Sequence, residues 1–158
     1  MQNAGVYQYT SMEIKLNNDA SLDHLGKIRE FYQRVGYAAD ISEDDDIITA
    51  RMDGDIIGAV RLCQENGVTV LRGMYIADDF QRAGVGTILL KKFLKLLAEK
   101  NIGEAYCIPY THLETFYARI GFRQITPLAA PEFLRRRLLK YLNEERDCIL
   151  MKLSLFKN

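Results

Sequence analysis

Apolar residues change their spacing several times along the chain, and each change predicts a new element of secondary structure. Between residues 10 and 16 they alternate with polar residues, which is typical of a strand with one buried face. From about residue 22 to residue 35 they recur at helical spacing, with Ser21 as the expected N-cap and Gly36 as the expected stop. The chain therefore begins with a strand and an amphipathic helix.

Two hairpin signals organise the next part of the chain. Asp53-Gly54 and Asn66-Gly67 separate three apolar runs, over residues 47–52, 55–63 and 68–77. Asp-Gly and Asn-Gly pairs favour the two-residue turns that join antiparallel strands. We therefore expect three consecutive antiparallel strands.

The second half of the chain alternates helical and strand patterns. A long amphipathic helix is expected from about Gly84 to Lys100, ended by Ile102-Gly103. Thr111 and Glu114 have the spacing of a capping box at the start of a short helix that stops at Gly121. The remaining elements are strands over 104–109, 122–125 and 148–155 and a helix over 131–143.

These elements define a fold class. A helix separates strand 68–77 from strand 104–109, so the crossover makes these two strands parallel neighbours or near-neighbours. The expected fold is α/β (α+β), with a mixed, mostly antiparallel sheet of about seven strands flanked by helices. With 158 residues the chain suits one domain, expected over residues 10–158, with a flexible tail at residues 1–9.

Composition narrows the function classes. Lys plus Arg and Asp plus Glu both number 21, which gives no general reason to expect nucleic acid or an anionic membrane as partner. Three widely spaced cysteines in apolar stretches suggest buried, reduced thiols, and no metal-ligand spacing is present. No apolar run reaches membrane length and no signal peptide is apparent, so we expect a cytoplasmic protein.

The segment from Gln81 to Gly86 carries the clearest chemical signal. A glycine-bearing turn that opens a helix collects unpaired backbone N–H groups and the positive end of the helix dipole, which suits a phosphate. A Walker-type loop would need Lys and then Ser or Thr after its last glycine, where this chain has Thr87 and Ile88. A dinucleotide fingerprint would need a third glycine or alanine where Leu89 stands.

The segment from Gln81 to Gly86 resembles the acetyl-CoA-binding segment of the GNAT superfamily of N-acetyltransferases. In that superfamily the pattern is Gln or Arg, two further residues, Gly, one further residue, and then Gly or Ala. The order of strands and helices matches that superfamily over nearly the whole domain. The resemblance implies that the loop N–H groups hold the CoA pyrophosphate and that the strand before the loop holds the pantetheine arm. The residues so implied are Met74, Tyr75, Ile76, Gln81, Arg82, Ala83, Gly84, Val85, Gly86 and Thr87.

A second resemblance lies in the segment from Phe116 to Phe122. A tyrosine at this place in the family often protonates the departing CoA thiolate, which implies Tyr117 as the general acid; a phenol is largely protonated at neutral pH. The alternative is packing, because Tyr117 also lies on an apolar helix face. Many relatives carry an asparagine one or two turns earlier, where this chain has Tyr110, Thr111 and His112. A similar segment near Tyr32 follows the first helix, and we expect Tyr32 to pack in the core or to contact substrate.

The general base and the acceptor are less well marked. Strand 68–77 contains only Arg72 as a charged group, so the candidates for the base are Glu104, Glu114, His112 or a water relay. Cys107 is a weaker candidate, as an acyl-carrying nucleophile. The acidic stretch from Glu43 to Asp46 favours a cationic amine acceptor or is simply a solvated loop.

Three successive arginines, Arg135 to Arg137, are expected on the outer face of helix 131–143, with contact to a CoA phosphate or a homodimer interface as alternatives. The leading function is transfer of acetyl from acetyl-CoA to a primary amine of a small molecule or protein, without a metal. A non-catalytic acyl-CoA binding or sensing module is the main alternative, and a nucleotide-binding oxidoreductase is a weaker one.

Overall fold

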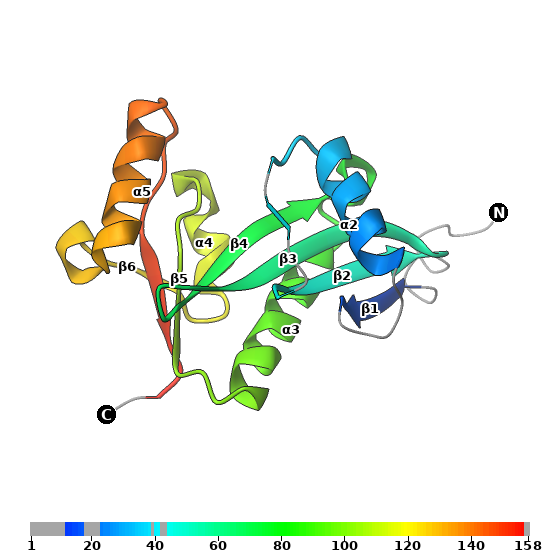
Figure 1. Cartoon of the computed structure of the whole chain (residues 1–158), viewed down its shortest axis with the longest axis horizontal. Helices are drawn as coiled ribbons and strands as arrows, with labels where there is room; N and C mark the ends of the chain where they lie inside the picture. Colours follow the sequence, from blue (N-terminus) through cyan, green and yellow to red (C-terminus); the bar gives the residue numbers. More distant parts are fainter. Residues whose placement is uncertain (1–11, 18–22, 39, 42–43, 157–158) are drawn as a thin grey trace. The chain divides into compact units, whose positions relative to one another are not determined.

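The computed structural model describes residues 12–17, 23–38, 40–41 and 44–156. The expected tail at residues 1–9, the expected cap Ser21 and the acidic residue Glu43 lie outside the described residues. Seven strands form one sheet in the order β1-β2-β3-β4-β5-β7-β6 (Figure 1). The strands are β1 (Met12–Leu16), β2 (Asp46–Met52), β3 (Asp55–Glu65), β4 (Val68–Ile76), β5 (Glu104–Cys107), β6 (Arg123–Gln124) and β7 (Met151–Ser154).

Helices separate some of these strands along the chain, whereas β2, β3 and β4 follow one another directly. The α-helices are α2 (Asp23–Arg34), α3 (Val85–Glu99), α4 (Glu114–Ala118) and α5 (Glu132–Asn143). Short 3₁₀ turns are η1 (Asp78–Phe80), η2 (Thr111–Leu113) and η3 (Pro127–Ala129). β4 pairs with β5 in parallel, whereas β1 with β2, β2 with β3, β5 with β7 and β6 with β7 are antiparallel. The predicted fold class, a mixed and mostly antiparallel sheet with flanking helices, is confirmed.

Both predicted hairpin turns are present. The central residues have left-handed backbones, with φ of 52° and 86° at Asp53 and Gly54 and of 52° and 76° at Asn66 and Gly67. Positive φ at both central positions is what a type I′ turn requires and what Asp-Gly and Asn-Gly accept at low cost.

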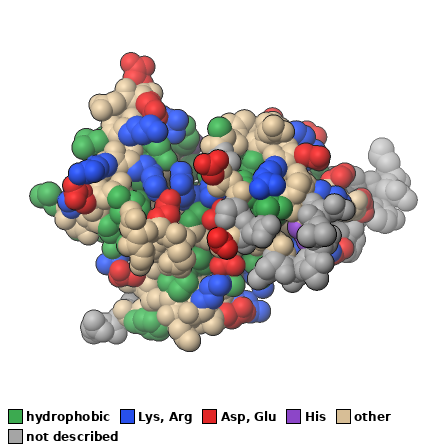
Figure 2. All heavy atoms as spheres, viewed as in Figure 1, with side chains coloured by type: hydrophobic (Ala, Val, Ile, Leu, Met, Phe, Trp, Pro, Cys, Tyr) green, Lys and Arg blue, Asp and Glu red, His purple; other side chains and the backbone are tan. Residues whose placement is uncertain are grey.

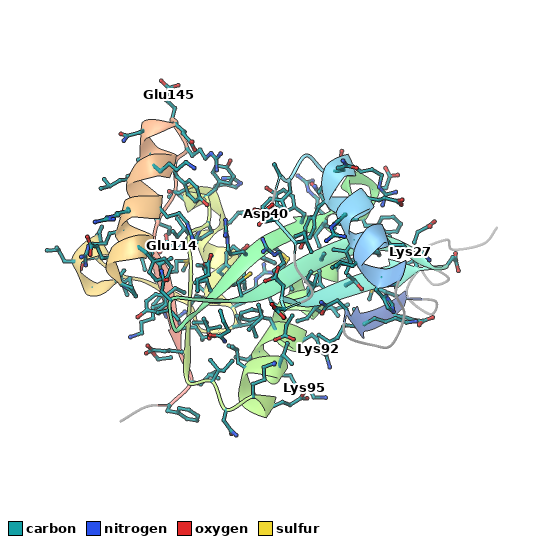
Figure 3. The ribbon with its side chains drawn as sticks, viewed as in Figure 1. Lys27, Asp40, Lys92, Lys95, Glu114 and Glu145 are labelled. Carbon is teal, nitrogen blue, oxygen red and sulfur yellow. The ribbon has the colours of Figure 1, made fainter. Side chains whose placement is uncertain are left out.

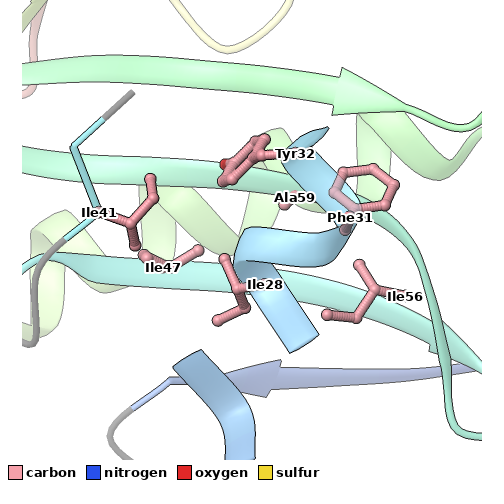
Figure 4. Packing of buried hydrophobic residues seen from close by; sticks show 7 residues of the cluster. All are labelled: Ile28, Phe31, Tyr32, Ile41, Ile47, Ile56 and Ala59. Carbon is pink, nitrogen blue, oxygen red and sulfur yellow. The ribbon is translucent and has the colours of Figure 1, made fainter. Parts of the chain in front are cut away.

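The chain divides into two compact units, one containing Met1–Cys63 and Gly73–Phe93 and the other Gln64–Arg72 and Leu94–Asn158. In the first unit α2 packs on the strands through a buried cluster, drawn in Figure 4. The cluster consists of Ile28, Phe31, Tyr32, Ile41, Ile47, Ile56 and Ala59. A Cβ on Gly58 would instead meet the side chains of Val85 and Leu89 of α3. Because successive strand residues face opposite sides, α2 and α3 cover opposite faces of β3 within this unit.

The second unit has its own core, between α5, the strands β4 and β5, and the segment just before β7. Its buried residues are Val70, Tyr106, Ala130, Leu134, Leu138, Cys148 and Leu150. Leu134 and Leu138 supply the buried side of α5, as the helical spacing predicts, whereas Leu139 and Leu142 are exposed. All three cysteines are buried and none of them forms a disulfide, as expected.

One local prediction is wrong, and one helix ends by a different signal from the predicted one. The capping box fails because the Thr111 hydroxyl bonds instead to the carbonyl (3.2 Å) and the carboxylate (3.0 Å) of Asp147, and no side chain caps η2 or α4. Helix α3 (Val85–Glu99) matches the predicted range of about Gly84 to Lys100 within one residue, but the residue that ends it is Asn101 and not Ile102-Gly103. Asn101 takes φ of 56° and donates to Ala98, while the Ile102 N–H donates to Leu97. This is the Schellman pattern, with asparagine in the place usually taken by glycine.

The molecular surface carries both signs of charge. On the face seen in Figure 2 acidic and basic side chains are interspersed, in keeping with the formal net charge of zero. Lys92 and Lys95 project from α3 in Figure 3. Within the described part of the chain no helix is long and apolar enough to cross a membrane.

Candidate functional site

The segment after β4 folds as a compact loop with two left-handed residues. Asp78–Phe80 forms the 3₁₀ turn η1, after which Gln81 is extended. Arg82 and Gly84 have φ of 69° and 83°, and α3 begins at Val85. A left-handed backbone at a residue other than glycine costs about 1–3 kcal/mol and tends to occur where a ligand or a sharp turn is served.

Backbone N–H groups collect where this loop meets the helix. The first bond into α3 is donated by the Ile88 N–H to the Gly84 carbonyl, at 3.2 Å. The N–H groups of Gly84, Val85 and Gly86 precede that bond, so helix geometry provides them with no acceptor inside α3. A Cβ at Gly84 would meet nothing within 4 Å, so the space beside this backbone is open. These three backbone N–H groups and the dipole of a 15-residue helix favour the binding of an anion.

Other loop residues hold the shape of the turn. The Gln81 side-chain amide donates to the Ile76 carbonyl at 3.2 Å and to the Asp78 carboxylate at 3.3 Å. The Ala83 N–H donates to Phe80. Gln81 thus ties the loop to the end of β4, a role that its place in the sequence motif did not reveal.

β4 runs on beyond its pairing with β5 and contains a glycine with a left-handed backbone. β4 pairs with β5 at Val70 and Tyr106, then continues to Ile76, whereas β5 ends at Cys107. Inside β4, Gly73 has φ of 61°, a conformation of the kind that strand bulges use. An isolated strand glycine is a sequence signal for such a bulge, but sequence reasoning did not single out Gly73.

Buried polar side chains surround this stretch of β4 within the first unit. Arg61, only 4% exposed, donates to the Tyr37 hydroxyl (2.7 Å), the Asp40 carbonyl (3.2 Å) and the Asp45 carboxylate (2.9 Å). Asp40, labelled in Figure 3, lies in the connection that follows α2. Tyr32 is buried and donates to the Gly73 carbonyl at 2.8 Å. Sequence reasoning missed Arg61 altogether and left Tyr32 between packing and substrate contact.

Tyr117 belongs to the second unit, whereas the residues from Met74 to Thr87 belong to the first. It is 5% exposed on α4, and its ring packs edge-on against Phe116 (centroids 5.0 Å apart) and Phe122 (6.1 Å). A packing role is therefore present. The catalytic role of Tyr117 stays a prediction, and so does its proximity to the loop from Gln81 to Gly86.

The candidate bases differ in their surroundings. Glu104 is exposed and forms an ion pair with Lys152 at 3.1 Å. Glu114 is the first residue of α4, and His112 is exposed and stacked on the Tyr110 ring, with centroids 5.8 Å apart. Burial raises the pKa of Cys107 well above its ordinary value, which keeps the thiol protonated and argues against a nucleophile. Among the described residues no group of His, Cys, Asp or Glu is arranged to hold a metal ion.

The three arginines of α5 are not equivalent. Arg136 is exposed and forms an ion pair with Glu132, and Arg135 donates to the Ala130 carbonyl. Arg137 is only 22% exposed and donates two bonds, of 2.9 and 3.1 Å, to the Glu65 carboxylate. Arg72 donates a third bond to Glu65 at 3.1 Å. The prediction that all three arginines lie on the solvent-exposed face of the helix is therefore wrong for Arg137. This residue joins α5 to the β3–β4 hairpin.

This contact makes a pH-dependent contribution to stability. Burial raises the pKa of Glu65, but the bonds and charges of Arg137 and Arg72 outweigh burial and hold it below its ordinary value. A lowered pKa contributes stability above about pH 4.3, the ordinary glutamate value, that is lost as the pH falls through the folded-state value. We expect Glu65→Gln to cost about 1–3 kcal/mol at pH 7 and to remove this part of the acid sensitivity.

Urea unfolding between pH 7 and pH 3 measures this effect. Glu132→Gln is the matched control, because its exposed pair with Arg136 is expected to contribute at most about 0.5 kcal/mol. Equal losses in the two variants would contradict the assignment of Glu65 as the stronger contact.

Comparisons with known proteins identify the family and support the fold. The family model for the acetyltransferase (GNAT) domain matches residues 17–135. A search of curated proteins gives no match.

Solved structures share the fold at low identity. Ribosomal-protein-S18-alanine N-acetyltransferase from Escherichia coli is 16% identical, with a TM-score of 0.68 and coverage of 93% of this chain and 96% of that one. A GNAT-family acetyltransferase from Staphylococcus aureus Mu50 is 16% identical, with a TM-score of 0.66 and coverage of 92% and 99%. N-acetylglutamate synthase from Neisseria gonorrhoeae, in complex with coenzyme A and N-acetyl-glutamate, is 15% identical, with a TM-score of 0.67 and coverage of 92% and 35%. This chain thus spans about a third of the length of that synthase.

Proposed function

The chain belongs to the GNAT acetyltransferase family, and from this premise we propose that it is an N-acetyltransferase that moves acetyl from acetyl-CoA to a primary amine of a small molecule or a protein. The observation that carries the proposal is the loop from Gln81 to Gly86. Its left-handed turn and the start of α3 place the N–H groups of Gly84, Val85 and Gly86 together. A CoA-bound relative of the same fold supports this choice of donor.

In this proposal the loop and β4 share the donor. The pyrophosphate accepts bonds from the backbone around Arg82 to Thr87, and the exposed Arg82 side chain adds positive charge. The pantetheine arm lies along Met74, Tyr75 and Ile76, where an extended amide chain bonds to strand backbone as an added strand would. Gly84 keeps a side chain out of the space beside the phosphates.

The reaction proposed is direct attack by a neutral amine on the thioester carbon. A new C–N bond forms as the C–S bond breaks, the nitrogen gives up a proton and the sulfur accepts one from Tyr117. A backbone N–H of β4, at Ile76 or a neighbour, polarises the thioester carbonyl. No residue is assigned as the base, which leaves Glu104, Glu114, His112 or water for that role.

The acceptor is proposed to be a cationic amine. Asp40 and Asp44 are exposed in the connection between α2 and β2, and their field favours a positively charged partner. We place the reaction in the cytoplasm, where buried thiols such as the three in this chain stay reduced.

Turnover and binding together test the proposal. Acetyl-CoA is incubated with the protein and a panel of mono-, di- and polyamines, amino acids and lysine peptides, and free CoA thiol is measured. We expect amine-dependent thiol release, and thermal stabilisation by CoA of about 2.7 kcal/mol at one hundred times its Kd. Stabilisation by CoA without turnover on any amine would favour a binding module, and stabilisation by NAD(H) instead of CoA would contradict the proposal.

A further inference from the structure

The backbone of β4 at Gly73 is held from outside the strand. Tyr32, on α2, is 2% exposed and donates its hydroxyl hydrogen to the Gly73 carbonyl at 2.8 Å. Figure 4 shows Tyr32 within the buried cluster between α2 and the strands. A tyrosine in such a cluster usually packs, but this one also ends in a directed bond to the strand that precedes the candidate loop.

Three side chains lie close to the position that a Cβ of Gly73 would occupy. A Cβ there would lie 3.0 Å from the Tyr32 hydroxyl, from Cδ of Arg61 and from Cε2 of Tyr37. Arg61 is in turn fixed by Tyr37 and by the carboxylate of Asp45. The positive φ of Gly73 and these contacts restrict the arrangement of this peptide and exclude a side chain at this position.

We propose that Tyr32 is a positioning residue for acetyl transfer, which fixes the Gly73–Met74 peptide so that the Met74 N–H meets the acyl arm of the donor in the orientation that transfer needs. This inference rests on the proposed function. It adds a residue of α2, outside the loop and the strand, to the set that determines the rate.

Because the peptide is planar, the bond from the Tyr32 hydroxyl to the Gly73 carbonyl also sets the orientation of the Met74 N–H. In a trans peptide the carbonyl of one residue and the N–H of the next lie in one plane and point in opposite directions. Anchoring the Gly73 carbonyl on Tyr32 therefore aims the Met74 N–H away from α2. The ring of Tyr75 packs against Tyr32 (centroids 6.4 Å apart) and Tyr37 (5.0 Å), which fixes the next residue as well.

The hydroxyl remains a donor throughout the working pH range. Burial, with a smaller contribution from Tyr37, raises the pKa of Tyr32 well above its ordinary value, so the proton is retained. Removing this hydroxyl while keeping the ring leaves the Gly73 carbonyl unanchored and the cluster packed.

The experiment compares Tyr32→Phe with Tyr141→Phe, a half-buried tyrosine of α5 in the second unit. The readouts are the Kd for CoA by calorimetry, the infrared carbonyl band of bound [1-¹³C]acetyl-CoA, and kcat and KM with an amine found active for the wild type. For Tyr32→Phe we expect kcat to fall on the order of 10-fold, because small misplacement of reacting groups costs one to two decades. We expect KM for acetyl-CoA and Kd for CoA to change by less than about 3-fold, since uniform binding is retained. The carbonyl band should move toward that of free acetyl-CoA.

Several results would overturn the proposal. One is an unchanged carbonyl band with an unchanged kcat. Another is a loss of CoA affinity in step with a loss of thermal stability, which would mark Tyr32 as purely structural, and a third is the same effect in Tyr141→Phe. If the wild-type protein does not bind acetyl-CoA at all, the proposed function fails first and this inference falls with it.

Discussion

Replacing Gly84 with aspartate should remove CoA binding from a protein that remains folded. Gly84 has φ of 83° and open space beside it, so the new side chain fits without a clash and enters the region beside the loop N–H groups. Its carboxylate would compete for those donors and repel a pyrophosphate, at a cost of several kcal/mol, or on the order of 100-fold or more in Kd. Calorimetric titration with CoA measures the loss.

Gly54→Asp is the matched control for backbone strain. Gly54 has φ of 86°, also with nothing within 4 Å of a Cβ, but it lies in the β2–β3 hairpin. Both variants should lose about 1–2 kcal/mol of stability from the left-handed backbone. Only Gly84→Asp should lose CoA. Wild-type affinity in Gly84→Asp would remove the loop from the donor site.

Removing the hydroxyl of Tyr117 should lower kcat about 100-fold or more, because general acid catalysis commonly contributes two to four decades. Tyr117→Phe keeps the ring that packs against Phe116 and Phe122, so stability should change by no more than about 1 kcal/mol. Steady-state rates of CoA release with one amine, measured for the wild type and for Tyr117→Phe, give the ratio of the two kcat values.

Phe116→Leu separates catalysis from packing in this helix. It disturbs the ring contact with Tyr117 and leaves the hydroxyl in place. If Phe116→Leu slows the reaction as much as Tyr117→Phe does, the role of Tyr117 is packing. Full activity of Tyr117→Phe would likewise exclude it as the acid.

Features that depend on local backbone chemistry could be predicted from the sequence. Asp53-Gly54 and Asn66-Gly67 demand positive φ at two successive positions, and the structure has it at both. The loop from Gln81 to Gly86 could be located because its glycines stand between a strand and a helix with a clear apolar stripe. Periodicity and turn chemistry act over a few residues, so a single sequence displays them.

Features that depend on distant partners could not be predicted. Thr111 fits a capping box, but its hydroxyl bonds to Asp147, 36 residues away. Arg137 has the spacing of a solvent-facing residue and yet bonds to Glu65, 72 residues away. Tyr32 and Gly73 are 41 residues apart, and no periodic pattern relates them. Among these residues only Gly73 has a recognisable sequence signal, because it is a glycine within an apolar strand.

A crystal structure with acetyl-CoA bound tests the central claim most directly. The account predicts the pyrophosphate oxygens at hydrogen-bond distance, about 2.7–3.2 Å, from the N–H groups of Gly84, Val85 and Gly86. It also predicts the pantetheine arm along Met74 to Ile76. A pyrophosphate bound anywhere other than at the start of α3 would contradict it.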